Sequence, residues 1–112
     1  SIFVVNFDPA IGSEIKKARP ALILQNDIAN KHSSVTIVAA ITSHEPKEKL
    51  YPTEVLVVAP EGGLSNDSVI LLNQIRTVDM GRLIKKLGQV NSKTIIKVDQ
   101  ALEISFGMID LK

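Results

Sequence analysis

The chain has 112 residues, 45% of them apolar and 22% charged, a length that suits one domain with a single core. Its net charge of +1 is not the strong basic excess that dedicated nucleic-acid-binding domains usually carry. It contains no cysteine, which excludes disulfides, thiolate metal sites and a cysteine nucleophile. No apolar run approaches the roughly 18 residues of a membrane span, and no signal-peptide pattern is visible, so we expect a cytoplasmic protein.

Six segments have the β-branched and apolar composition of strands, and they cover residues 2–7, 20–25, 35–41, 53–58, 68–78 and 82–90. Because the first begins abruptly and without a methionine, we expect a few leading residues to be missing. The imperfect alternation of the fifth segment predicts a bend or bulge, and the spacing within the sixth would also suit a helix. Polar segments at residues 8–18 and 43–52 predict two long loops.

The segment that follows these strands has the periodicity of a helix. Asn91 or Ser92 can cap its N-terminus. Apolar residues recur at spacings of three and four and predict one buried stripe made of Ile95, Val98, Leu102, Phe106 and Ile109. The sequence therefore predicts one domain, residues 1–112, that is mostly β with an appended α-helix, built as a small curved sheet or barrel.

A candidate phosphate site lies where two expected strands begin and end. Arg19 precedes Pro20, and proline fits the first residue of a strand because it has no N–H to donate. Thr42 directly follows the third expected strand. If these two strands lie side by side, Arg19 and Thr42 share one end of the sheet. One guanidinium and one hydroxyl at that place would form a small phosphate site.

The sequence lacks the motifs of several other catalytic classes. There is no glycine-rich phosphate loop, no His-Glu-x-x-His and no Gly-x-Ser-x-Gly. His32 and His44 are too few for a histidine-only metal site and lie in polar segments, so we expect no metal and exposed side chains, with His44 near substrate as the alternative. Four basic residues form a group in the second half of the chain: Arg76, Arg82, Lys85 and Lys86. This group is either a solvent-exposed face or a nucleic-acid contact.

Several segments, taken in order, resemble one known family. They are DPAIGSE at residues 8–14, RPALIL at 19–24, AAITS at 39–43, YPTEV at 51–55, DSVILLNQIRTVD at 67–79 and LIKKLG at 83–88. Each piece alone is weak, but together they cover essentially the whole chain with the right gaps. The chain resembles the MazF/PemK family of toxin endoribonucleases.

That resemblance implies an SH3-like β-barrel of the CcdB/PemK type, with helices, that forms a homodimer. It implies the toxin of a type II toxin–antitoxin system, which cleaves single-stranded mRNA at specific sequences without a metal or cofactor. In this chemistry the 2′-hydroxyl attacks the adjacent phosphate and leaves a 2′,3′-cyclic phosphate and a 5′-hydroxyl. The implied partner is a MazE-like antitoxin, an acidic and partly disordered chain that competes with RNA for one groove.

The resemblance also implies which residues are catalytic. Arg19 would hold the phosphate bidentately and stabilise charge in the transition state, because arginine does not readily lose a proton. Thr42 would donate a hydrogen bond to a phosphoryl oxygen. Glu14 either orients Arg19 or the 2′-hydroxyl, or is a surface carboxylate. Ala18 stands where some members have histidine, so the general base stays open.

A second set of residues is expected to bind RNA. Ser43 and Gln74 could read base edges, with polar packing on the sheet as the alternative. Lys17 lies in the basic segment before Arg19, while Phe7 and Tyr51 flank the two long loops and could stack on bases. The other two aromatic side chains, Phe3 and Phe106, are expected in the core.

Two other functions remain open from the sequence. The related CcdB-type toxins share the fold and bind DNA gyrase without cleaving RNA. A nucleic-acid-binding barrel without catalytic activity is the third reading. RNA cleavage separates the first reading from both.

Overall fold

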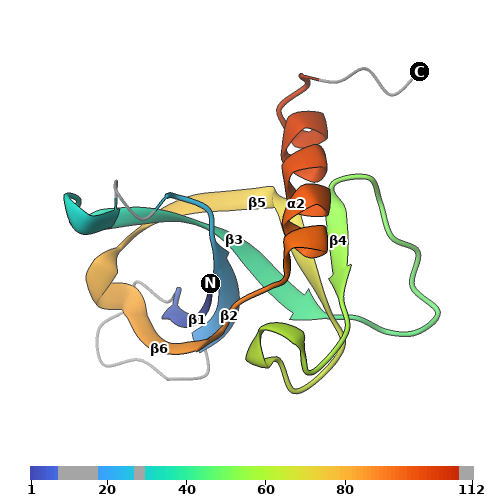
Figure 1. Cartoon of the computed structure of the whole chain (residues 1–112), viewed down its shortest axis with the longest axis horizontal. Coiled ribbons are helices and arrows are strands. Elements are labelled where there is room, and N and C mark those ends of the chain that lie inside the picture. The colour runs from blue at the N-terminus through green and yellow to red at the C-terminus, as the bar shows by residue number, and fades with distance from the viewer. Residues whose placement is uncertain (8–17, 27–29, 109–112) are drawn as a thin grey trace.

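The computed structural model describes residues 1–7, 18–26 and 30–108, and within them six strands form one antiparallel sheet (Figure 1). The strands are β1 (Ile2–Asn6), β2 (Ala18–Ile23), β3 (Val35–Ser43), β4 (Glu54–Val57), β5 (Ser68–Asp79) and β6 (Leu83–Gly88). Their order is β4-β5-β3-β2-β1-β6, so β4 and β6 are the edges and the sheet is curled without being closed by a ladder between them. The predicted mostly-β fold with an appended helix is confirmed.

The second strand begins before Pro20, the residue at which the sequence predicted its start. It starts at Ala18 and carries Pro20 inside it, opposite Val4 of β1. This is tolerated because the ladder between β2 and β3 begins only at Ala21, after the residue that has no N–H to donate. Arg19 is therefore held within a strand rather than just before one.

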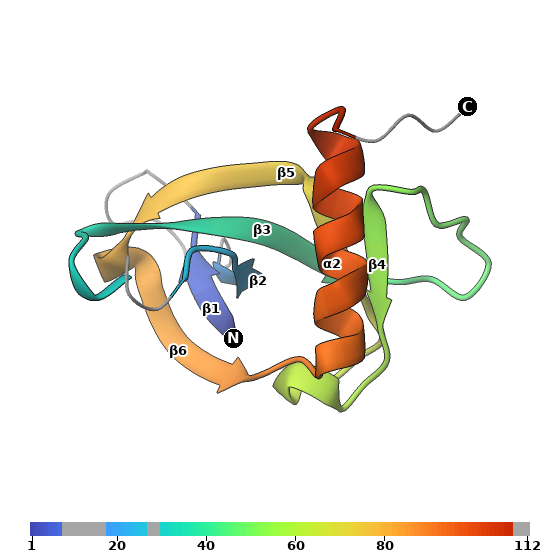
Figure 2. The same ribbon diagram turned by 45° about the horizontal axis from the view of Figure 1, so that its top comes forward.

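A bulge bends β5, as its imperfect alternation predicted. Ala39 of β3 pairs with Ile75, whereas the next residue, Ala40, pairs with Leu71. Residues 72–74 thus have no partner on β3, and Leu72 instead donates its backbone N–H to the carbonyl of Thr53 at 2.9 Å. The bend can be followed in Figure 2, where β5 runs along β3 at one end of the molecule and turns toward β4 at the other.

Two apolar clusters lie on opposite faces of the sheet, because successive residues of a strand point to alternate sides. The larger cluster lies beneath the helix and includes Ile2, Leu22, Ile70, Leu72 and Val98. The smaller one lies inside the curl and is formed by Val5, Ala21, Val38 and Val78, with Phe3 and Phe7 packed against it. The expected core position of Phe3 is confirmed.

The helix α2 (Ser92–Ser105) packs on β4 and β5 (Figure 1), and Asn91 caps it by accepting a hydrogen bond from the Thr94 N–H at 2.9 Å. Its buried residues are Thr94, Val98 and Ala101. The predicted apolar stripe is therefore wrong in part, because Ile95 and Phe106 are 40% and 64% exposed. The buried face instead follows Thr94, Val98 and Ala101 at spacings of four and three, which leaves Ile95 on the solvent side. Ile109 lies outside the described residues.

The loop between β3 and β4 is long and polar as predicted, and residues 45–52 are exposed throughout. The other expected loop, residues 8–18, lies almost wholly outside the described residues. Among the helices that the structure describes, none is long and apolar enough to cross a membrane.

Candidate functional site

The structure brings Arg19 and Thr42 to the same end of the sheet, as the sequence predicted. Ala21 of β2 pairs with Ala40 of β3, and continuing this antiparallel register by two residues places Arg19 opposite Thr42. Both side chains are exposed, and both line one hollow of about 290 Å³. We call it the Arg19–Thr42 hollow. Ser43, the next residue of β3, lines it as well.

The opposite wall of the Arg19–Thr42 hollow comes from a turn that the sequence did not assign to any site. The turn η2 (Glu61–Gly63) leads into residues 64–66, and Gly63, Leu64, Ser65 and Asn66 all line the hollow. Gly63 has a φ of 78°, and an added Cβ there would lie 2.1 Å from the carbonyl oxygen of Leu87. Only glycine allows the turn to pack this closely on β6.

A second hollow, of about 410 Å³, adjoins the first because Arg19 lines both. Its other lining residues include Phe7, which directly follows β1, and Gln74 and Arg76 from β5. The guanidinium carbon of Arg76 lies 5.0 Å from the centre of the Phe7 ring, a cation–π contact. We call it the Phe7–Arg76 hollow.

Three of the expected RNA-binding residues are therefore near Arg19. Ser43 lines one hollow, and Phe7 and Gln74 line the other. Tyr51 is 59% exposed in the β3–β4 connection and lines neither. Glu14 and Lys17 lie outside the described residues.

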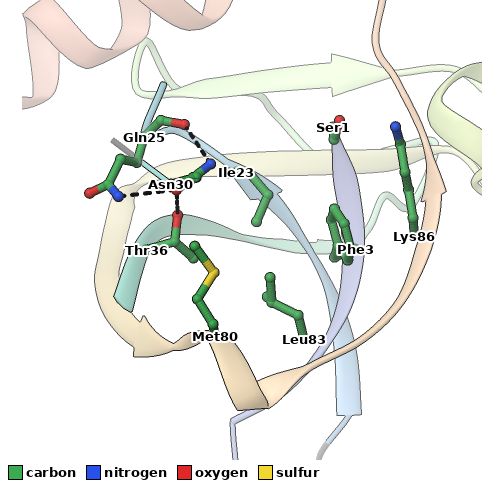
Figure 3. Close-up of a pocket in the computed structure, with 9 residues that line it drawn as sticks. All are labelled: Ser1, Phe3, Ile23, Gln25, Asn30, Thr36, Met80, Leu83 and Lys86. Carbon is green, nitrogen blue, oxygen red and sulfur yellow. Dashed lines mark hydrogen bonds between the residues drawn. The ribbon is translucent and has the colours of Figure 1, made fainter. Parts of the chain in front are cut away.

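A third hollow, of about 340 Å³, lies at the end of the sheet where β6 follows β5 (Figure 3). Thr36 donates a hydrogen bond to Asn30 Oδ1 at 2.7 Å, and Gln25 Nε2 donates to the same oxygen at 3.0 Å. Asn30 in turn donates to the Gln25 carbonyl at 3.2 Å. These polar groups bind one another and tie the segment before β3 to the sheet. Neither Arg19 nor Thr42 lines this hollow.

Neither histidine joins the site. His32 is exposed as expected, whereas the expected exposure of His44 is wrong, because this residue is half-buried. Its backbone N–H donates to the carbonyl of Asp67 at 3.0 Å, next to the start of β5. Within residues 1–7, 18–26 and 30–108, no three histidine or carboxylate side chains are grouped so that they could hold a metal ion.

Comparison with known proteins assigns this chain to a family. A family model described as PemK-like, MazF-like toxin of type II toxin-antitoxin system matches residues 1–106. Endoribonuclease EndoA of Bacillus subtilis is 46% identical over 109 residues, covering 97% of this chain and 93% of that protein. Endoribonuclease MazF of Staphylococcus epidermidis is 45% identical over 107 residues, covering 96% of this chain and 88% of that protein.

Solved structures agree with the sequence matches. MazF from Deinococcus radiodurans superposes with a TM-score of 0.74 and 29% identity, covering 96% of this chain and 93% of that one. The toxin MazF-mt6 of Mycobacterium tuberculosis gives a TM-score of 0.77 at 25% identity, covering 95% of each chain. The chain therefore belongs to the PemK-like, MazF-like family of toxins of type II toxin–antitoxin systems.

Proposed function

We propose that this chain is a toxin endoribonuclease that cleaves single-stranded RNA, with mRNA as its cellular substrate. The observation that carries the proposal is the placement of Arg19 and Thr42 on facing strands, lining one hollow. Relatives named as endoribonucleases, with 46% and 45% identity over nearly the whole chain, support it.

The RNA supplies the nucleophile in this reaction. The 2′-hydroxyl oxygen forms a bond to the adjacent phosphorus while the bond from phosphorus to the 5′-oxygen breaks. The products are a 2′,3′-cyclic phosphate and a 5′-hydroxyl, and the proton lost from the 2′-oxygen is balanced by one gained at the 5′-oxygen. No protein nucleophile is needed, so neither the hydroxyl of Thr42 nor any other side chain has to form a covalent intermediate.

Arg19 and Thr42 have distinct roles in this proposal. The planar guanidinium of Arg19 donates two parallel hydrogen bonds to phosphoryl oxygens and stabilises the negative charge that builds there. Thr42 donates one further hydrogen bond to the same phosphate from the facing strand. Glu14 is the candidate for orienting Arg19 or the 2′-hydroxyl, since Ala18 offers no base beside Arg19.

The two hollows on either side of Arg19 suit the nucleotides on either side of the bound phosphate. Gln74 can hydrogen-bond to a base edge in the Phe7–Arg76 hollow, where the Phe7 ring and the Arg76 guanidinium offer flat faces for stacking. Ser43 can do so in the Arg19–Thr42 hollow. Tyr51 extends the RNA contact beyond these hollows, and Lys17 is a further candidate contact.

The protein partners follow from the family. The chain forms a cytoplasmic homodimer, and a MazE-like antitoxin covers the groove that binds RNA. A structure of a MazE–MazF complex from Deinococcus radiodurans, whose toxin chain has a TM-score of 0.73 and 26% identity to this one, supports the antitoxin partnership.

Cleavage of a long labelled single-stranded RNA in excess chelator tests the proposal. Wild-type protein should give discrete cuts with 5′-hydroxyl ends, and Arg19→Ala and Thr42→Ala should each cut about 100-fold more slowly, the usual cost of one transition-state donor. Lys97→Ala and Thr77→Ala are matched controls, because these exposed side chains line neither hollow beside Arg19.

Three results would argue against it. The absence of cuts from folded protein on several RNAs would favour a gyrase-binding or catalytically silent module. Cuts that survive both site substitutions would place the reaction elsewhere on the chain. Cuts abolished by the chelator would show that the reaction requires a metal.

A further inference from the structure

The wall of the Arg19–Thr42 hollow that faces β3 carries a side-chain amide with no hydrogen-bond partner among the described residues. Asn66 is exposed and lines the hollow together with Arg19 and Thr42. Only its backbone carbonyl takes part in a hydrogen bond within the described chain. In Figure 3, by contrast, the amide of Asn30 donates and accepts hydrogen bonds within the protein.

The backbone that presents this amide is held in place at Asn66 and at the residue that follows it. Ser68 Oγ donates to the Asn66 carbonyl at 2.8 Å. The next residue, Asp67, accepts the Ala59 N–H on its carboxylate at 2.9 Å and the His44 N–H on its backbone carbonyl at 3.0 Å. Because these bonds fix the chain, little backbone conformational entropy is lost when the side chain binds a ligand.

The Arg19–Thr42 hollow has one charged side chain at one end and neutral side chains along the rest of its lining. Among the described residues that line it, Arg19 is the single charged side chain, while Thr42, Ser43 and Ser65 offer hydroxyls and Asn66 an amide. A phosphate at Arg19 would leave the attached nucleotide beside the neutral side chains. An amide presents both a donor and an acceptor, and so can pair with two adjacent groups on a base edge.

We propose that Asn66 is a specificity-determining residue, whose amide reads the edge of the base next to the phosphate bound by Arg19 and Thr42. The inference rests on the proposed endoribonuclease function and adds to it a base-reading residue. Bases in single-stranded RNA expose the edges that such an amide needs. A carboxylate at the same place would offer acceptors alone and would select guanine, whose N1–H and N2–H₂ form an adjacent pair of donors.

Cleavage of a randomised RNA library, with the cut ends sequenced, tests this role. Wild type should show a base preference at a position adjoining the cut. Asn66→Ala should weaken that preference roughly tenfold at this position and leave the others unchanged, and Asn66→Asp should shift it toward guanine. Gln100→Glu, the same amide-to-carboxylate change on an exposed residue of α2, should leave the profile as in wild type.

Thermal unfolding of each variant shows whether it is folded, and we expect unchanged midpoints because the Asn66 amide bonds to no described residue. A profile that is identical in wild type and both Asn66 variants would overturn the inference. Equal slowing at every sequence would also overturn it, since that result indicates a phosphate contact. If wild type cuts no member of the library, the endoribonuclease proposal fails and this inference fails with it.

Discussion

At the scale of single residues, the site is organised around Arg19. Its side chain lines both the Arg19–Thr42 hollow and the Phe7–Arg76 hollow, and we propose that each hollow takes one nucleotide. A bound RNA would therefore have one phosphate at Arg19, and the protein could recognise the base on each side of that phosphate. The division of labour follows from chemistry, because the guanidinium recognises the backbone while amides and hydroxyls recognise bases.

Arg76 should contribute to RNA binding more than to the reaction itself. Arg76→Ala removes the cation over the Phe7 ring, so we expect KM to rise several-fold while kcat stays within about twofold. The dependence of log KM on log salt should flatten by about 0.7, the value for one contact to a single strand. Lys97→Ala is the control. A fall in kcat with unchanged KM would instead make Arg76 part of the catalytic machinery.

At the scale of elements, composition predicted all six strands of the described sheet and the terminal helix. The prediction failed where tertiary contacts decide the outcome. The start of β2 depends on where the β3 ladder begins, and the buried face of α2 depends on how the helix packs on β4 and β5.

The candidate site could be predicted in the same partial way. Arg19 and Thr42 follow from motifs at strand ends. The wall that carries Asn66 could not be predicted from motifs. It depends on the register that pairs Ser43 with Ser68 and on the packing of Gly63 against Leu87. The pairing of Phe7 with Arg76 likewise joins two strands that are distant in sequence, and periodicity within one strand carries no information about it.

The turn that forms this wall should tolerate no side chain at its second glycine. Gly63→Ala places a Cβ at a φ of 78° and 2.1 Å from the Leu87 carbonyl oxygen, so we expect the free energy of unfolding to fall by at least about 2 kcal/mol. Gly81→Ala is the matched control, since no atom lies within 4 Å of its Cβ position. Urea unfolding measures both. Equal stability of the two variants would contradict the packing described here.

At the scale of the whole molecule, a single chain leaves large apolar side chains in solvent. On α2 and the residues that follow it, Ile96 is 58%, Phe106 64% and Met108 71% exposed. Their position on and just after one helix suits a protein that works in contact with other chains.

The free protein should be a homodimer. Light scattering after gel filtration should give the mass of two 12.2 kDa chains at micromolar concentration. Addition of an acidic MazE-like antitoxin should then slow RNA cleavage competitively, raising the apparent KM without changing kcat, because we propose that antitoxin and RNA bind the same groove. A monomeric mass, or inhibition that lowers kcat alone, would contradict this arrangement.

The central claim is that Arg19 and Thr42 act on one phosphate, and a double-mutant cycle tests it most directly. Single-turnover cleavage rates of one RNA would be compared for wild type, Arg19→Ala, Thr42→Ala and the double variant. Groups that stabilise the same transition state are coupled, so the double variant should lose much less than the product of the two single losses. The claim would be contradicted if the rate loss of the double variant equals the product of the two single-variant losses. It would also be contradicted if either single variant keeps the wild-type rate.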